Sequence, residues 1–358
     1  MIRAILAAAL VLSTTTLCAL GAEPDPAPLL SPARAACAAG ALPSGAAEKT
    51  FVVAGWPDRD YDIELPASHR CGQPIALVVV YHGGGANKES VRKLACPGGD
   101  LQSAACLDRT ALAAGMAVVF PNGTNARGGK LLNRHGVRTW NAGGGQNGAI
   151  CVSGSACTKG IDDIAYTRAL LAELARRIDI DGRRVFASGF SDGAAMTQRL
   201  GCEAAETFAA IAPVSGENQF ALTGCAPAER VAVLDVHGTL DKCWPYAGGE
   251  GGCIQSGLYV SVAETLAGWA ARNGCDATPS SATLPPRPGV NDGTSVVRLA
   301  YANCAAGGQL EHLEVVGNGH YWPDGYCYAS GRLLGGTMSR QLDTGQVIVD
   351  FFVAHARP

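Results

Sequence analysis

The sequence predicts an α/β protein with a doubly wound, mostly parallel β-sheet and helices on both faces. Apolar runs that suit strands buried on both faces alternate with segments of helical periodicity along most of the 358 residues. Hydrophobic residues make up 47% of the chain, enough for a sizeable core, and the formal net charge of −3 comes with no basic patch of the kind that binds nucleic acid.

The N-terminus predicts an export signal. Arg3 supplies a positive n-region, and residues 4–12 form an apolar stretch that is too short to span a bilayer. Small residues precede a cleavage site after Gly21. We therefore expect a secreted or periplasmic monomer with no membrane or nucleic-acid partner. The expected organisation is a signal peptide (1–21), a flexible Pro- and Ala-rich segment (22–45) and a single α/β domain (46–358).

Cysteine usage agrees with export and predicts five disulfides. Loss of Cys18 with the signal leaves thirteen of the fourteen cysteines, which allows at most six bridges and one free thiol. No CxxC pair or Cys/His cluster with ligand spacing occurs, so we expect no metal. Spacing does not decide which of Cys37, Cys71 and Cys327 is unpaired. The predicted pairs are Cys96–Cys106, Cys151–Cys157, Cys202–Cys225, Cys243–Cys253 and Cys275–Cys304.

Each expected strand is an apolar or alternating run bounded by turn residues, and each expected helix repeats apolar residues at helical spacing. The strands are 50–56, 60–66, 74–83, 116–123, 183–189, 208–216, 231–238, 296–304 and 311–317. The helices are 106–115, 159–178, 191–201, 261–274 and 344–356. Two long connections, 125–160 and 239–257, carry aromatic residues, and connections of this length in a compact domain typically line a site.

The stretch "RRVFASGFSDGAAM" (183–196) places a Gly-x-Ser-x-Gly pattern where a strand turns into a helix. The pattern alone is a weak signal in a chain with 46 glycines. A nucleophile elbow needs small residues two before and two after the serine, and Gly189 and Gly193 meet this requirement. The helix N-terminus directs free N–H groups and a positive dipole at Ser191. We therefore predict Ser191 as a nucleophile.

A nucleophilic serine needs a base, and the base needs a residue that orients it. In α/β-hydrolases these follow in the order Ser, Asp or Glu, His, each after a strand. Asp241 comes just past the strand 231–238, and His320 comes just past the last predicted strand. Asp235 is the alternative acid, but it falls inside its strand. The predicted triad is Ser191, Asp241 and His320.

An oxyanion hole needs two backbone N–H groups, one of them from the residue after the nucleophile. That residue is Asp192. The second donor is expected from the glycine run in "VVVYHGGGAN", and Gly84 is the choice because a residue without Cβ lets its N–H approach a substrate closely. His82 in the same run is expected to hydrogen-bond loop backbone and not to act in catalysis.

The segments "HGGGAN", "WNAGG", "FAAIAPVSG", "HGTLDKCWPY" and "GNGHYWP", together with the elbow, resemble the secreted esterase family that contains polyhydroxybutyrate depolymerases and feruloyl esterases. The likeness runs from about residue 50 to 355. It implies an α/β-hydrolase fold, an ester substrate, no cofactor, and triad roles for Ser191, Asp241 and His320. Two loops depart from the family: Gly145 follows "WNAGG" where relatives often have a cysteine pair, and "DKCWPYAGGEGGC" is more heavily bridged than usual.

Substrate identity is the property that transfers least, because both of these loops are expected to border the substrate. Trp140, Trp244, Tyr321 and Trp322 are the candidates for stacking on an aromatic acyl group or a sugar. Depolymerases of solid polyester usually carry a linker and a surface-binding domain, whereas this chain ends just after its last helix. We therefore expect feruloyl or other carbohydrate-linked esters. The alternatives are a polyhydroxybutyrate depolymerase, a serine peptidase and a non-catalytic binding protein with a hydrolase fold.

Overall fold

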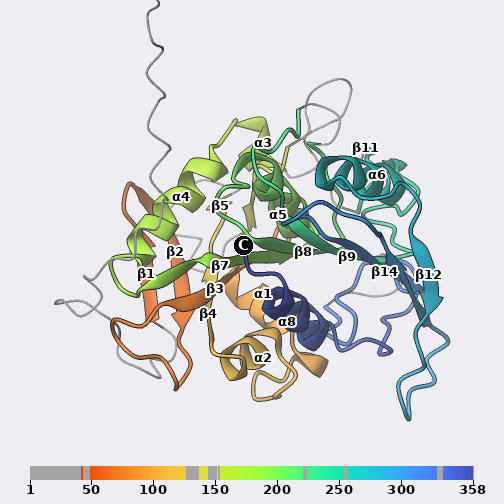
Figure 1. Ribbon diagram of the computed structural model, residues 1–358, viewed down its shortest axis with the longest axis horizontal. Helices are drawn as coiled ribbons and strands as arrows, with labels where there is room; N and C mark the ends of the chain where they lie inside the picture. The colour runs from red at the N-terminus through yellow and green to blue at the C-terminus, as the bar shows by residue number, and fades with distance from the viewer. Residues whose placement is uncertain are drawn as a thin grey trace, which may run out of the picture.

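The structure is a computed structural model that describes residues 42, 49–125, 137–143, 151, 154–220, 224–253, 257–328 and 334–357. A ten-stranded sheet crosses the molecule (Figure 1). Its strands, in sheet order, are β1 (Lys49–Val53), β2 (Trp56–Glu64), β4 (Met116–Pro121), β3 (Ile75–Tyr81), β7 (Ile180–Phe190), β8 (Ala210–Val214), β9 (Ala232–Gly238), β14 (Leu310–Val316), β13 (Ser295–Ala300) and β12 (Ser280–Thr283). The six strands from β4 to β14 pair in parallel, and the strands at both edges are antiparallel.

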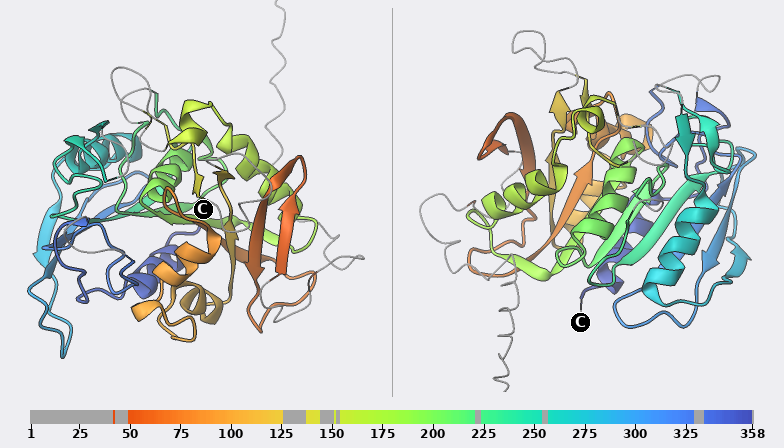
Figure 2. Two further views of the ribbon diagram at one scale, coloured as in Figure 1. Left: turned by 180° about the vertical axis from the view of Figure 1, so that it is seen from behind. Right: turned by 90° about the horizontal axis from the view of Figure 1, so that it is seen from above.

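Helices cover both faces of the sheet, as Figures 1 and 2 show. One face carries α3 (Ser155–Thr158), α4 (Asp163–Leu174), α5 (Asp192–Glu203) and α6 (Val262–Asn273). The other carries α1 (Lys88–Leu94), α2 (Leu107–Ala113) and α8 (Thr344–Ala354). The smaller elements are the 3-10 turn η2 (Pro97–Gly99) and the two-stranded pairs β5 (Thr124–Asn125) with β6 (Arg138–Thr139) and β10 (Gly249–Gly251) with β11 (Gly257–Tyr259). The predicted doubly wound α/β class is confirmed.

The sheet separates two hydrophobic cores, and β3 contributes to both. Leu77 and Tyr81 belong to the core under α4, α5 and α6, which includes Trp269. Val78 alternates with them and belongs to the core under α1, α2 and α8, which includes Phe352. All seven residues of β3 are buried, because successive side chains point to opposite faces and both faces are covered. The continuous apolar run in this segment is therefore a strand buried on both faces, as the sequence predicted.

Several boundaries differ from those predicted. The helix expected over 159–178 begins at Asp163, because the Asp162 side chain caps it by accepting the N–H of Ala165 at 2.8 Å. Helix α1 was not predicted, since its seven residues are too few for a clear helical period. All four residues of β12 are exposed, so this edge strand carries no burial pattern that a sequence could reveal.

The five predicted disulfides are all present: Cys96–Cys106, Cys151–Cys157, Cys202–Cys225, Cys243–Cys253 and Cys275–Cys304. Cys71 is also disulfide-bonded, and Cys327 lies at the surface. Cys37, the signal peptide and all but one residue of the expected flexible segment lie outside the described residues. Among the helices that are described, none combines the length and apolar character needed to cross a membrane.

A buried ion pair joins β2 to α4. Nη1 of Arg59 lies 2.5 Å from Oδ1 of Asp163, and the two side chains are 4% and 0% exposed. The guanidinium also sits over the ring of Tyr166, 3.3 Å from its centroid. The other oxygen of Asp163 accepts the backbone N–H of Asn141 at 2.5 Å. The pair therefore fixes the start of the "WNAGG" loop as well as the helix.

We predict that Arg59→Met lowers the free energy of unfolding by about 3–5 kcal/mol, because it leaves the buried Asp163 carboxylate without its counter-charge. Urea denaturation followed by tryptophan fluorescence measures this. Arg176→Met is the control, since Arg176 is 65% exposed and its pair with Glu173 should contribute less than about 1 kcal/mol. Equal, small effects of the two substitutions would contradict the role of the buried pair.

Candidate active site

Ser191 occupies a strained turn between β7 and α5. Its φ of 58° and ψ of −120° are unusual for a residue with a side chain, and such strain is typical of a nucleophile elbow. A Cβ on Gly189 would lie 2.4 Å from the carbonyl oxygen of Gly193, and a Cβ on Gly193 would lie 2.2 Å from that of Tyr81. The steric requirement for both flanking glycines is thus confirmed. Gly216 is a third, which the sequence analysis missed: its Cβ would lie 2.2 Å from the Ser191 carbonyl oxygen.

The structure brings Ser191, His320 and Asp241 into one hydrogen-bonded series. His320 Nε2 lies 2.9 Å from Ser191 Oγ, and His320 Nδ1 lies 2.8 Å from Asp241 Oδ2. Ser191 follows β7, Asp241 follows β9 and His320 follows β14, so all three lie at the carboxyl edge of the parallel sheet. The carboxylate can only accept, so Nδ1 donates to it and Nε2 faces the serine hydroxyl as an acceptor. This arrangement can take a proton from Ser191.

Both oxygens of the Asp241 carboxylate have polar partners. Its Oδ1 accepts the backbone N–H groups of Cys243 and Trp244, both at 2.8 Å. Nε2 of His237 lies 3.4 Å from Oδ2. Burial alone would raise the pKa of Asp241, but His320 and His237 beside it lower that pKa to about 2. Asp241 is therefore ionised at neutral pH.

The alternative acid, Asp235, lies inside β9 and faces another histidine. Its Oδ2 lies 2.7 Å from Nδ1 of His312, which stands opposite it on β14. Its Oδ1 accepts from the Gln198 side chain at 3.3 Å. These contacts are enclosed by the sheet, whereas Asp241 lies beyond the strand end.

The glycine loop after β3 lies against the elbow. A Cβ on Gly83 would be 3.4 Å from Ser191 Cβ, and one on Gly84 would be 3.4 Å from Asp192 Cβ. The loop is fixed by His82, as expected: its Nε2 accepts the N–H of Gly123 at 2.9 Å, and its Nδ1 donates to the Gly83 carbonyl at 2.8 Å. Burial lowers the pKa of His82 to about 3, so it stays neutral in this role.

The buried side chain of Asp192 reaches away from the serine. Its Oδ2 accepts the backbone N–H of Trp140 at 2.9 Å. Burial raises the pKa of this carboxyl well above its usual range, although the bond from Trp140 opposes the shift. Asp192 thereby ties the elbow to the "WNAGG" loop, and its side chain also lies against Gly84.

The four aromatic residues expected to offer stacking surface are buried, so that expectation is corrected. Trp140, Trp244, Tyr321 and Trp322 are 0%, 4%, 3% and 1% exposed. Trp140 lies edge-on to Tyr81 and donates its Nε1–H to the His82 carbonyl at 2.9 Å, and Trp244 lies edge-on to Tyr259. A tryptophan next to a motif looks the same in sequence whether it faces the substrate or packs the loop. These residues belong to the hydrophobic cores: Trp140, Trp244 and Tyr321 to one and Trp322 to the other.

Phe190 lies beside the histidine of the site, and a second aromatic residue, Tyr328, contacts Phe190. The Phe190 ring centroid lies 4.7 Å from that of His320, and Tyr328 stands edge-on to Phe190 at 6.4 Å. Tyr328 is 51% exposed. It was missed because it lies eight residues past His320, outside any motif.

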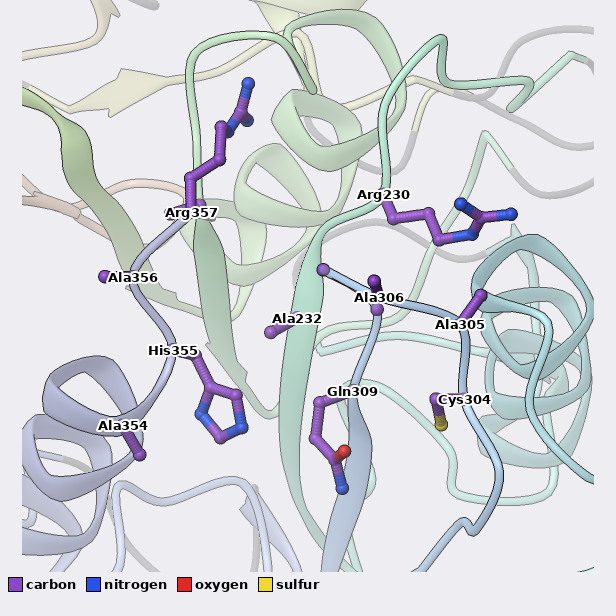
Figure 3. A pocket seen from close by; sticks show the side chains of 13 residues that line it. Arg230, Ala232, Cys304, Ala305, Ala306, Gln309, Ala354, His355, Ala356 and Arg357 are labelled. Carbon is purple, nitrogen blue, oxygen red and sulfur yellow. The ribbon is translucent and has the colours of Figure 1, made fainter.

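Neither of two further features adds a second site. The clusters Cys96–Cys106–Asp108 and Asp241–Cys243–His320 are compact enough for a metal ion, but the sulfurs are disulfide-bonded and offer no thiolate. A cavity near the start of β9 is bordered by Arg230, His355 and Arg357, and Figure 3 shows that the two arginine side chains point apart. It lies at the edge of the sheet opposite Ser191.

Comparison with known proteins points to esterases. No family model matches the chain. It is 29% identical over 174 residues to Feruloyl esterase B of Piromyces equi, covering 47% of this chain and 31% of that protein. It is 28% identical over 222 residues to Feruloyl esterase C of Emericella nidulans, covering 62% and 64%. The matched part thus spans less than two thirds of either relative.

Among solved structures, the acetyl xylan esterase from Aspergillus awamori superposes with a TM-score of 0.50 and 16% identity, covering 77% of this chain and 94% of that one. At this identity the likeness bears on the fold alone. The fold is that of the α/β-hydrolases, as the sequence predicted.

We predict that Gly193→Ala destabilises the protein by about 1–3 kcal/mol and lowers kcat, since the added methyl group must push α5 away from the Tyr81 carbonyl and displace Ser191. Chemical denaturation and ester turnover measure the two effects. Ala194→Gly is the control: it acts on the same turn of α5 and costs about 1 kcal/mol in helix propensity without disturbing the elbow. An alanine at 193 with unchanged kcat would contradict the steric argument.

Proposed function

Because the chain is a distant relative of the feruloyl esterases within the α/β-hydrolase superfamily, we propose that it is a serine esterase that cleaves carboxylic esters through an acyl-enzyme. The observation that carries the proposal is the series Ser191–His320–Asp241, with contacts of 2.9 and 2.8 Å, built on a strained elbow. Packing alone gives no reason for Ser191 to hold an unfavourable φ so that its hydroxyl faces a histidine.

In the proposed mechanism, His320 Nε2 takes the proton from Ser191 as Oγ attacks the ester carbonyl carbon. The oxygen of the tetrahedral intermediate carries the negative charge and binds the backbone N–H groups of Asp192 and Gly84. His320 then gives its proton to the leaving alcohol, and the acyl group remains on Ser191. Water repeats the sequence and releases the acid. Asp241 stays ionised and holds the imidazole throughout.

We propose feruloyl or other plant-wall, carbohydrate-linked esters as the substrates. Sequence likeness to two feruloyl esterases supports an aromatic acyl group. The half-exposed ring of Tyr328 lies edge-on to Phe190, which in turn lies beside His320, and it supplies an aromatic surface on which such a group can stack. Hydroxybutyrate oligoesters are the second candidate substrate, and peptides the third, since a triad of this kind does not itself distinguish esters from amides.

We also propose that the protein works outside the cytoplasm. Disulfides persist in oxidising compartments; five join pairs of described cysteines, and Cys71 is also disulfide-bonded. N-terminal sequencing of the protein recovered from the medium or the periplasm should find Ala22 first, as cleavage after Gly21 requires.

We predict that Ser191→Ala lowers kcat for p-nitrophenyl acetate by a factor on the order of 10⁴–10⁶ and leaves the fold intact. Ser188→Ala is the matched control: this buried serine lies on the same strand, and its Oγ donates to the Ala212 carbonyl at 2.7 Å. Its loss should cost about 1 kcal/mol of stability and keep most of the activity. Near-normal turnover by Ser191→Ala would refute the proposed mechanism.

We predict that Tyr328→Ala lowers kcat/KM for methyl ferulate about tenfold and changes that for p-nitrophenyl acetate much less, because only the larger acyl group reaches the ring. Tyr328→Phe keeps the ring and should keep the preference. A panel with acetylated xylan and hydroxybutyrate trimers ranks the substrate classes. Equal losses on acetate and ferulate would argue against recognition of an aromatic acyl group by Tyr328.

A further inference from the structure

A second histidine lies directly behind the triad. His237, at the end of β9, is 1% exposed, and its Nδ1 lies 2.6 Å from Oε1 of the fully buried Glu217. Its Nε2 lies 2.8 Å from the Trp244 carbonyl oxygen and 3.4 Å from Oδ2 of Asp241. The series of polar contacts that links Ser191, His320 and Asp241 therefore extends further into the protein, from Asp241 to His237 and from His237 to Glu217.

The partners of His237 determine where its hydrogens lie. The Trp244 carbonyl can only accept, so Nε2 carries a hydrogen. On the other side, a bare Nδ1 and an ionised carboxylate are both acceptors and would repel each other at 2.6 Å, so a proton lies between His237 and Glu217. Burial opposes a charged His237, but hydrogen bonds to Asp241 and Glu217 raise its pKa well above the usual range. The imidazolium form satisfies every one of these contacts.

We propose that Glu217 and His237 are positioning residues of the active site, in which a His237 imidazolium held by Glu217 orients Asp241 and takes up part of its negative charge. This inference rests on the proposed esterase function. The single carboxylate of Asp241 faces two imidazoles, those of His320 and His237. The positive charge on His237 offsets part of the negative charge that Asp241 presents to His320. We therefore expect the His237 charge to extend activity to lower pH than Asp241 alone would allow.

The other titratable groups around His237 form a separate cluster. The Tyr246 ring lies 5.8 Å from that of His237, and its hydroxyl lies 3.0 Å from Nε2 of His312. Nδ1 of His312 lies 2.7 Å from Asp235, whose charge contributes to raising the pKa of Glu217. His312 is 0% exposed and paired with a carboxylate, as His237 is, but its hydrogen bonds go to Tyr246 and Asp235 and not to Asp241. It provides a matched control.

The test is the pH profile of kcat/KM for p-nitrophenyl acetate, measured from about pH 4 to 9 on wild type, His237→Gln, Glu217→Gln and His312→Gln. We expect the acid limb of His237→Gln to move up by about 0.5–1 pH unit, because Asp241 then serves His320 alone. Glu217→Gln should move it in the same direction by less, since the amide can still bond to a neutral His237. His312→Gln should lower stability and leave the limb in place. An unmoved limb in folded, active His237→Gln, or an equal shift in His312→Gln, overturns the proposal.

Ring-nitrogen NMR tests the same pair without turnover. In ¹³C,¹⁵N-labelled wild type at about pH 7, both ring nitrogens of His237 should give protonated signals, assigned by through-bond correlation to the His237 backbone. A neutral His237 would overturn the proposal even if the variants fail to fold. The two proposals can be refuted independently. A wild-type protein without Ser191-dependent ester hydrolysis would refute the esterase function. The imidazolium signals report only on the pair formed by His237 and Glu217.

Discussion

The site depends on a contact between two backbones. Helix α5 starts so close to the end of β3 that a single methyl group on Gly193 would lie 2.2 Å from the Tyr81 carbonyl oxygen. This approach sets Ser191 and the glycine loop after β3 side by side, which is the spacing that a nucleophile and an N–H donor require. Residues separated by about a hundred positions are placed by this contact, and the strain at Ser191 is retained because the surrounding elements leave no room to relax it.

Around this contact, buried polar groups hold the loops. Burying such a group is costly unless it is bonded, so each bonded group also fixes the segment that bonds it. His82 clamps the glycine loop, Asp192 ties the elbow to the backbone of Trp140, and Asp163 links Arg59 to the same loop one residue further on. Together these bonds fix the loops at the carboxyl edge of the sheet.

Features determined by local interactions could be predicted from the sequence. Strand ends, the glycines that flank Ser191 and pairs of cysteines near each other in the chain leave a signature within a few residues. Features that depend on a neighbour from elsewhere in the fold could not be predicted. Nothing near Trp140 tells that its indole points inward, and nothing near Gly216 tells that the Ser191 carbonyl lies against it. Glu217 and His237 are twenty residues apart, and only the packing of β8 beside β9 brings them together.

Among the described residues, β9 and β14 and the turns after them carry two carboxylate–histidine pairs. The two pairs differ in role because they lie at different positions along the strands. Asp235 and His312 are partners in the ladder itself, so the strands on either side and the helix above enclose them. Asp241 and His320 come after the last residues of the same two strands, where the chain leaves the sheet and the imidazole can turn toward Ser191. The same two side-chain types thus serve as a structural pair inside the sheet and as the proposed catalytic pair at its edge. Position relative to the strand end, which is readable from sequence, is what separates them.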